Sequence, residues 1–154
     1  MFTASELLDL AIQIEVNGER FYRRAMRKVK RDSVKNLLRW LADQELVHKS
    51  EFTELKEKIT HGTKPDLSFP SLSQQVVSRA MGRHSFSLEE LQIDSIQGEE
   101  EMLRAALIFE EDTILFFEFI APFVSDPDSV SVLEKIRTEE FNHKRLLVEN
   151  LSRI

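Results

Sequence analysis

The sequence contains no cysteine among its 154 residues. This absence excludes a disulfide framework, a thiolate metal site and a catalytic cysteine, and it is compatible with a reducing cytosol. The first residues, MFTASELLDLAIQIE, also lack a basic stretch followed by an apolar run, so no secretory signal peptide is expected. We therefore expect a cytoplasmic protein.

Glycine and proline are scarce, with four of each, which favours long helices over a turn-rich fold. Long apolar runs are absent too, because the most apolar stretch, TILFFEFIAPFV, is short and contains Glu118. A helix that spans a bilayer needs about 20 apolar residues, so no membrane association is expected. The formal net charge of −6 argues against nucleic acid as a partner.

One basic run, RRAMRKVKR at residues 23–31, departs from this acidic balance. The simpler interpretation is a solvated helix end whose cations face the negative end of the helix dipole. Docking of an acidic partner is the alternative.

Cap and turn signals divide the chain into four long helices. A capping box, Thr3-Ala4-Ser5-Glu6, opens the first helix, and Asp126 followed by Pro127 opens the last. The helices are expected at about residues 4–30, from Asp32 or Ser33 to about 61, at 94–124 with Pro122 bending or ending the last turn, and from 126 onward.

The stretch 61–93 between the second and third helices is the least regular part, with a short helical piece expected near residues 72–81. It is long enough to return along the full length of the bundle. Two helical hairpins joined by one long crossover have the ferritin-like connection. The sequence therefore predicts an all-α, ferritin-like four-helix bundle that forms a single domain over residues 1–154.

Each helix has a seam of inward-facing residues at helical spacing, mostly apolar or small. A glutamate interrupts every seam near its middle, and two seams add a histidine three residues later. The interrupting residues are Glu15, Glu45, His48, Glu110, Glu140 and His143.

The same residues repeat across the two halves of the chain. Glu15 and Glu110 are 95 residues apart, as are Glu45 and Glu140, and His48 and His143. The flanking AIQIE resembles ALIFE. The chain therefore reads as two copies of one helical hairpin, each with a Glu followed by a Glu-x-x-His.

Four buried carboxylates without partners would destabilise a core, because an unpaired buried charge costs several kcal/mol or is neutralised. Two divalent cations would balance the four negative charges, and the two imidazoles would add ligands. This ligand pattern is typical of di-iron and di-manganese carboxylate proteins. A buried ion-pair network is the alternative, but the seams offer no Lys or Arg at this depth.

Neighbouring acidic and histidine residues fit the pattern less well. Glu111 and Asp112 follow Glu110 but leave the seam, so they are expected to face outward or to lie behind the ligands. His61 and His84 lack both the seam and the repeat, and we interpret them as loop or surface residues.

At these residues the chain resembles the rubrerythrin-like branch of the ferritin-like superfamily. The matching pieces are EVNGERFY from residue 15, ELVH from 45, EEDTILFF from 110 and EFNH from 140. The resemblance covers nearly the whole chain. It implies a dinuclear iron centre, with two Fe ions or Mn or Zn in their place, that reacts with hydrogen peroxide or dioxygen.

The chain departs from rubrerythrin in two ways. Rubrerythrin usually carries a Cys-rich rubredoxin module for electron delivery, so a chain without Cys is expected to need a separate electron-donor protein. Rubrerythrin also has an extra Glu one turn after its third-helix ligand, where this chain has Thr113. We therefore expect both histidines to remain ligands in both oxidation states.

Further residues are candidates for supporting the ligands. In the family, the residue before each Glu of Glu-x-x-His often accepts a hydrogen bond from the opposing His, and these positions are Gln44 and Glu139. They are equally well interpreted as polar flanking residues. Tyr22 lies two turns beyond Glu15, so its hydroxyl either bonds a ligand carboxylate or is satisfied elsewhere.

Three functions follow from this pattern. The first is an oxidoreductase, peroxidase-like or ferroxidase-like, with a role in oxidative stress. The second is a non-catalytic protein that binds, buffers or senses iron, and the third is a bundle in which metal only aids folding. A homodimer is the expected assembly.

Overall fold

The computed structural model describes residues 4–60, 93–124 and 126–154, and four long helices make up most of them. No strand occurs in these ranges, so the predicted all-α class is confirmed. The long helices are α1 (Ala4–Met26), α2 (Asp32–Thr60), α4 (Gly98–Ile120) and α5 (Pro127–Leu151), and the 3₁₀ turns η2 (Ile93–Ser95) and η3 (Ala121–Phe123) flank α4.

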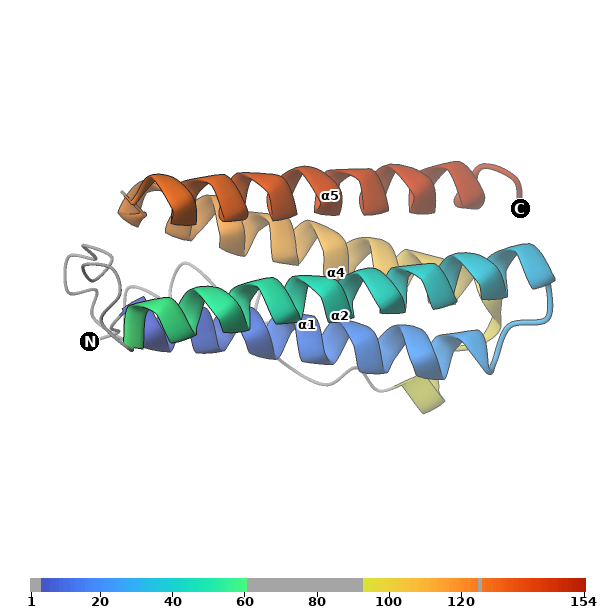
Figure 1. Ribbon diagram of the computed structural model, residues 1–154. Helices are drawn as coiled ribbons and strands as arrows, with labels where there is room; N and C mark the ends of the chain where they lie inside the picture. Colours follow the sequence, from blue (N-terminus) through green and yellow to red (C-terminus); the bar gives the residue numbers. More distant parts are fainter. Residues whose placement is uncertain (1–3, 61–92, 125) are drawn as a thin grey trace.

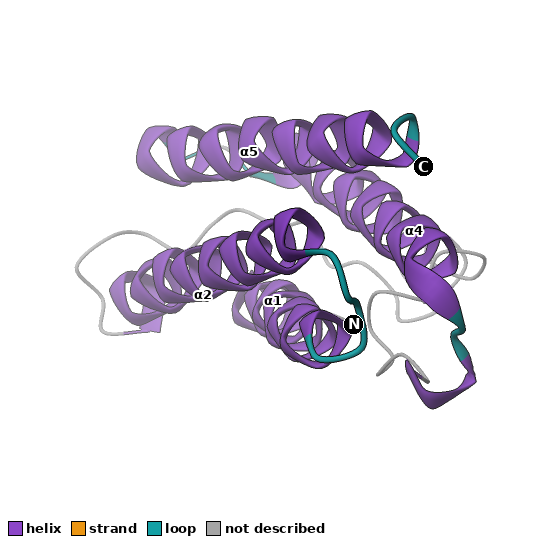
Figure 2. Cartoon of the chain, turned by 90° about the vertical axis from the view of Figure 1, so that its right-hand side faces the viewer, coloured by secondary structure: helices purple, strands orange, loops and turns teal. Residues whose placement is uncertain are grey.

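The four helices lie side by side as two antiparallel hairpins (Figure 1). Packing is most extensive within the pairs α1–α2 and α4–α5, and weaker contacts join α1 to α4 and α2 to α5. The view turned by 90° shows α5 above α2 and α4 beside the α1–α2 pair (Figure 2). α2 ends at one end of the bundle, and α4 begins at the other (Figure 1).

The predicted boundaries at α5 are confirmed. Asp126 caps the helix by accepting a hydrogen bond from the backbone N–H of Ser129 at 3.1 Å, and Pro127 occupies the first turn. Pro122 lies in the 3₁₀ turn that ends α4, as expected for a residue without a backbone N–H.

Two boundaries were wrong. The first helix ends at Met26 rather than near Lys30, because the chain must turn there into α2. The third helix begins at Gly98 rather than Asp94, and the φ of Gly98 is 81°, a conformation that favours glycine. The capping box at Thr3 and the short helix expected near 72–81 lie outside the described residues.

The hydrophobic core has two clusters, one toward each end of the bundle. The first includes Leu7, Phe52, Phe116 and Phe117. The second includes Phe21, Leu38, Leu41, Met102 and Leu147. Along every helix the buried glutamates and histidines fall between residues of these two clusters, so a polar layer divides an otherwise apolar core.

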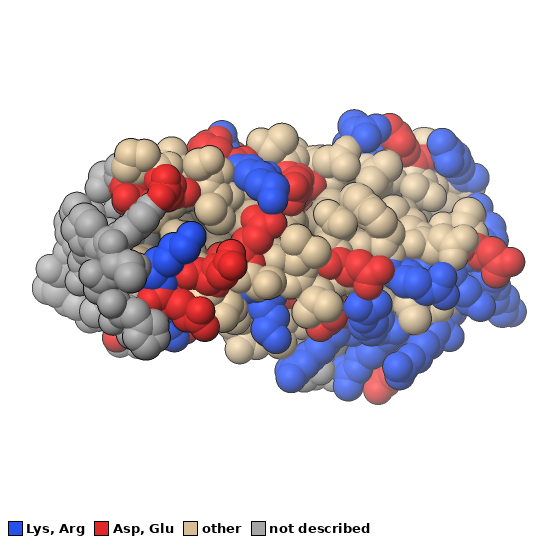
Figure 3. Space-filling model, in the orientation of Figure 1, with Lys and Arg blue, Asp and Glu red and all other residues tan. Residues whose placement is uncertain are grey.

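Charged side chains gather unevenly on the surface. Lys and Arg crowd the end of the bundle where α1 leads into α2 (Figure 3). Members of the basic run are paired with acidic residues: Arg31 Nε lies 2.8 Å from Glu99, and Lys28 Nζ lies 3.1 Å from Asp94. Within the described ranges, no helix is both long and apolar enough to cross a membrane.

Candidate metal centre

The six side chains that interrupt the seams meet in the middle of the bundle. Each of the four long helices supplies one glutamate, and α2 and α5 each add a histidine. All six residues are fully buried: Glu15, Glu45, His48, Glu110, Glu140 and His143. The helical periodicity explains this placement, because residues three and four apart lie on one face.

The donor atoms form two groups that overlap. Glu15, Glu45, His48 and Glu140 make one group, and Glu45, Glu110, Glu140 and His143 make the other. Within each group the donor atoms lie within 4.8 Å of one another. Glu45 and Glu140 belong to both groups, so each group takes its donors from both hairpins.

Both imidazoles direct the same ring atom into the cluster. Nδ1 of His48 lies 2.9 Å from Oε1 of Glu140 and 3.6 Å from Oε2 of Glu15. Nδ1 of His143 lies 3.0 Å from Oε2 of the same Glu140 and 3.6 Å from Oε1 of Glu110. The two oxygens of Glu140 therefore each face one histidine.

The outward ring atoms differ between the two histidines. Nε2 of His48 lies 2.6 Å from Oε2 of Glu139, so of the two interpretations of Glu139 the hydrogen bond to the opposing histidine is the one found. Nε2 of His143 is buried, and in the part of the chain that the structure describes it has no hydrogen-bond partner. The bond from His143 to Gln44, one of the two interpretations of Gln44, is therefore not found.

Tyr22 makes the hydrogen bond to a ligand carboxylate that was one of its two interpretations. Its hydroxyl donates to Oε1 of Glu110 across the core. The phenol is fully buried. Burial and the negative charge of Glu110 hold the pKa of Tyr22 well above its ordinary value of 10.0, so this hydroxyl stays protonated and acts as a donor.

Three of the glutamates resist ionisation in the metal-free protein. Burial, and then the negative charge of Glu140, hold the pKa values of Glu15, Glu45 and Glu110 well above the ordinary value of 4.5. Desolvation acts in this direction on any carboxyl, and neighbouring anions add to it.

Glu140 and the two histidines behave in the opposite way. Burial by itself would raise the pKa of Glu140, but hydrogen bonds with His143 and His48 hold it well below 4.5. Burial would likewise lower the pKa of His48, yet its hydrogen bond with Glu140 and the surrounding carboxylates raise that pKa to about 9. The pKa of His143 is raised for the same reasons.

The cluster meets the requirements of a divalent cation site. Both oxygens of Glu15, both oxygens of Glu45 and Oε2 of Glu110 are buried without a hydrogen bond among the described residues. Buried polar atoms are normally satisfied, so these oxygens need either protons or cations. Two divalent ions would balance four carboxylates, and carboxylate oxygen and imidazole nitrogen suit iron, manganese and zinc.

The structure also shows where residues close to Glu110 in the sequence lie. Glu111 is exposed, and Oε1 lies 3.6 Å from Nζ of Lys144. Thr113 is buried, and its hydroxyl donates to the backbone carbonyl of Phe109 at 2.9 Å. His61 and His84 lie outside the described residues.

Sequence reasoning singled out neither Asn17 nor Gly18, and it left open whether Asp112 faces outward or lies behind the ligands. Asp112 and Asn17 are both buried, and they too are 95 residues apart, so the repeat carried this signal. Gly18 gives Glu45 room: a Cβ on Gly18 would lie 3.0 Å from the Phe109 ring and 3.2 Å from Cγ of Glu45. A glycine inside a long helix was the available signal.

Trp40 was missed as well. Its ring lies 5.4 Å from the ring of His143 at an interplanar angle of 79°, while 39% of the residue remains exposed. Trp40 therefore closes the surface side of one histidine. No sequence signal distinguished it from an ordinary surface residue.

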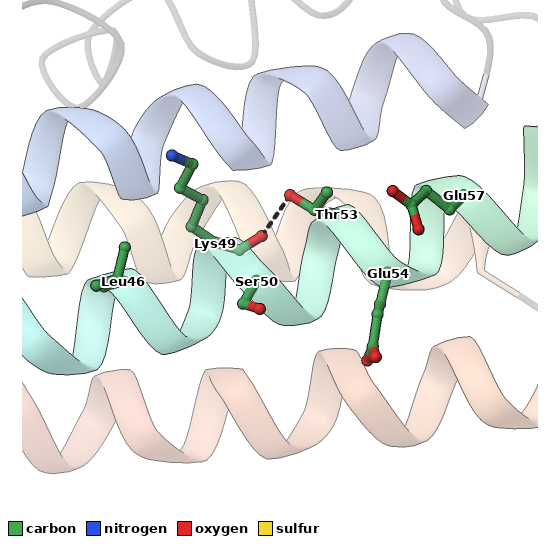
Figure 4. A pocket seen from close by; sticks show the side chains of 6 residues that line it. All are labelled: Leu46, Lys49, Ser50, Thr53, Glu54 and Glu57. Atoms are coloured by element: carbon green, nitrogen blue, oxygen red, sulfur yellow. Dashed lines mark hydrogen bonds between the residues drawn. The ribbon is translucent and has the colours of Figure 1, made fainter.

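A pocket on the outer side of α2 is lined by Leu46, Lys49, Ser50, Thr53, Glu54 and Glu57 (Figure 4). A second pocket, between α2 and α5, includes Glu51 and Lys135 in its lining. The six buried side chains line neither pocket. The cluster of six side chains is therefore part of the core rather than of either open depression.

Residues 6–151 match a family model described as Rubrerythrin. No curated protein matches the chain. One similar crystal structure, from Thermotoga maritima, is described as a ferritin-like diiron-carboxylate protein: the TM-score is 0.69 and the identity 23%, over 98% of this chain and 95% of that chain. A second similar solved structure, of a hypothetical protein from Pyrococcus furiosus, has a TM-score of 0.70 and 19% identity, over 98% of this chain and 89% of that chain. At these identities the likeness shows the fold alone, and the ferritin-like bundle is confirmed.

Proposed function

Because the chain belongs to the rubrerythrin family, we propose that its buried cluster binds two iron ions and that the loaded protein reacts with hydrogen peroxide or dioxygen. The observation that carries the proposal is the pair of overlapping donor groups that share Glu45 and Glu140. Two groups with shared carboxylates are suited to two ions held close together.

The protein supplies the ligands, their orientation and a dry setting. Nδ1 of His48 and Nδ1 of His143 face the carboxylates, so each imidazole would bind through that atom. When bound, two ferrous ions would supply the two electrons that, with two protons, reduce hydrogen peroxide to two water molecules. The apolar clusters on either side exclude bulk water from the layer between them.

Protons are held at defined atoms in this layer. Before metal binds, the raised pKa values of Glu15, Glu45 and Glu110 favour the protonated form of these carboxyls. Binding of cations must release them, because ligands coordinate in their deprotonated form. The Tyr22 hydroxyl keeps its proton and orients Glu110.

Turnover requires electrons from outside the chain. The sequence has no Cys and therefore no thiolate-bound electron-transfer centre. We propose that a separate electron-donor protein reduces the oxidised ions.

A non-catalytic iron-binding, buffering or sensing protein is the alternative function. The same buried donors favour it, since binding needs no access for an oxidant. Turnover with an added reductant distinguishes the two functions: a catalytic protein consumes many equivalents of peroxide per chain, whereas a binding protein consumes at most the equivalents that its iron can reduce.

The test is a single-turnover experiment. Protein loaded anaerobically with Fe(II) is mixed with one equivalent of hydrogen peroxide, and the near-ultraviolet absorption of ferric iron is followed by stopped flow. We expect fast formation in the parent and its loss in His48→Ala and in His143→Ala. Glu111→Ala is the matched control, because Glu111 adjoins Glu110 in sequence but is exposed.

Two outcomes of this experiment would contradict different parts of the proposal. Full reactivity in a histidine variant would show that this histidine is not a required ligand. A parent that binds two Fe(II) but reacts with neither peroxide nor dioxygen would contradict the oxidoreductase proposal and favour iron binding or a structural metal.

A further inference from the structure

We propose that the two metal positions are unequal: the position that uses His48 fills first and binds more tightly, and the position that uses His143 fills second. Glu139 supports only the first of these imidazoles. The inference rests on the proposed two-metal site and deepens it by assigning an order to its two halves.

The donor atoms themselves are closely matched. Each group contains the shared Glu45 and Glu140, one further glutamate and one histidine, all fully buried. The Nδ1 atoms of His48 and His143 lie 2.9 and 3.0 Å from the two oxygens of Glu140. A difference in affinity must therefore come from groups behind the ligands.

Behind His48 stands a carboxylate. Oε2 of Glu139 lies 2.6 Å from Nε2 of His48, and the Glu139 side chain is 34% exposed. An imidazole that donates its Nε2–H to a carboxylate presents a free lone pair at Nδ1 and becomes a more basic ligand. Glu139 thus fixes both the tautomer and the ring orientation that a metal at this position requires.

Behind His143 no such acceptor is present in the described residues. Its Nε2 is buried without a hydrogen bond, and the nearby group is the indole ring of Trp40, which packs against the imidazole. Metal binding at Nδ1 would leave the Nε2–H buried and unpaired, which is unfavourable. Packing holds this ring in place, but no carboxylate increases its basicity.

The surroundings of the two unshared glutamates also favour tighter binding at the His48 position. Tyr22 donates a hydrogen bond to Glu110, which belongs only to the His143 group. Glu15, which belongs only to the His48 group, accepts no hydrogen bond from the described residues. A donated hydrogen bond withdraws charge from a carboxylate oxygen, so Glu110 is the weaker of these two metal ligands.

Because the two hairpins repeat, exchanging residues between corresponding positions gives matched variants that test the role of Glu139. Gln44 and Glu139 are 95 residues apart and occupy corresponding places before the two Glu-x-x-His motifs. Glu139→Gln gives the second hairpin the amide of the first, and Gln44→Glu gives the first hairpin the carboxylate of the second. Neither change alters any of the six proposed ligands.

The experiment uses the metal-free full chain labelled with ¹⁵N-histidine and titrated with Zn(II), while ring-nitrogen chemical shifts are followed by NMR. Loss of signals in His48→Ala and His143→Ala assigns the two rings. We expect the first equivalent to shift Nδ1 of His48 and the second to shift Nδ1 of His143. The expected difference in affinity is about 10- to 100-fold, the usual effect of a carboxylate behind a metal-bound histidine.

Glu139→Gln should reduce this difference to a few-fold, and Gln44→Glu should reduce it by strengthening the His143 position. Glu134→Gln, an exposed change on the same helix as Glu139, is the control and should leave the order unchanged. Parallel shifts of both rings in the parent, or a shift of His143 first, would contradict the proposed difference in affinity between the two positions. Neither result would contradict the binding of two ions. No shift of either ring would contradict the metal site itself.

Discussion

The two hairpins, α1–α2 and α4–α5, contribute the same three ligand types at the same spacing but surround them with different neighbours. Tyr22 of α1 bonds a ligand of the other hairpin, whereas the corresponding residue of α4 is Phe117. Glu139 supports a histidine, whereas the corresponding Gln44 does not. The repeat thus preserves the ligands, and the two halves of the site differ one layer further out.

The contrast extends to the size of the residues that pack near the ligands. Gly18 of α1 has no side chain and leaves room for Glu45. The corresponding residue of α4, Thr113, has a side chain whose hydroxyl donates a hydrogen bond to the backbone carbonyl of Phe109 in the same helix. A symmetric set of ligands can therefore lie in an asymmetric core, and substitutions in the two hairpins test which layer controls which property.

The largest effect is expected at the shared carboxylates. Glu45→Ala and Glu140→Ala each remove a donor from both groups, so we expect neither position to retain tight binding. Glu15→Ala and Glu110→Ala each affect one group and should leave about one tightly bound ion per chain. Calorimetric titration with Co(II) measures the stoichiometry. Equal losses from shared and unshared glutamates would contradict the overlap of the groups.

The second effect concerns the stability of the metal-free protein. The pKa values of Glu15, Glu45 and Glu110 are raised well above 4.5, and that of His48 is raised from 6.5 to about 9. Between the unfolded and folded pKa values the folded protein binds more protons, so the free energy of unfolding should fall as pH rises from about 5 to about 9.

Glu140, whose pKa is lowered, contributes the opposite slope only below its ordinary value of 4.5, so it does not reverse this trend. Urea unfolding at a series of pH values measures it, and saturating Zn(II) should abolish it. If the metal-free protein were equally stable at pH 5 and pH 8, the carboxyls would not be clustered as described.

A smaller effect is expected for Tyr22→Phe. The change keeps the ring and removes the hydroxyl that donates to Glu110, so the metal-free protein should lose about 1–2 kcal/mol of stability. Urea unfolding at pH 7 provides the measurement. Phe117→Tyr, at the corresponding position of α4, is the reciprocal variant. An unchanged stability in Tyr22→Phe would show that the hydrogen bond makes no net contribution.

The smallest effect is expected for Gly18→Ala. The new Cβ would lie 3.0 Å from the Phe109 ring and 3.2 Å from Glu45. Overpacking of this kind costs roughly 1–3 kcal/mol, and the better helix propensity of Ala returns about 1 kcal/mol. We expect a net loss of about 1 kcal/mol in thermal unfolding of the metal-free protein. A stabilised Gly18→Ala variant would show that Phe109 and Glu45 adjust without cost.

The sequence predicted most of the fold because its signals are local. Asp126 and Pro127 mark the start of α5, and the seams are periodic over many turns. The end of α1 was not predicted, since residues 27–30 have ordinary helix formers but the chain must turn there into α2. That constraint comes from the packing of two helices rather than from local preference. The start of α4 at Gly98 was not predicted either.

The six candidate ligands were predicted from periodicity combined with the repeat, and the structure brings all of them together. The sharing of Glu45 and Glu140 was not predicted, because it depends on how the hairpins face each other. The roles of Trp40 and Gly18 were missed for the same reason: what each residue contacts is set by a helix distant in sequence.

The central claim is that two ions are held in one core by ligands from both hairpins. Anaerobic titration of the metal-free protein with Fe(II), followed by separation of bound from free metal, tests it most directly. The account predicts saturation at two ions per chain in the parent and fewer in Glu110→Ala. Saturation of the parent at one ion or none, or undiminished binding in Glu110→Ala, would contradict it.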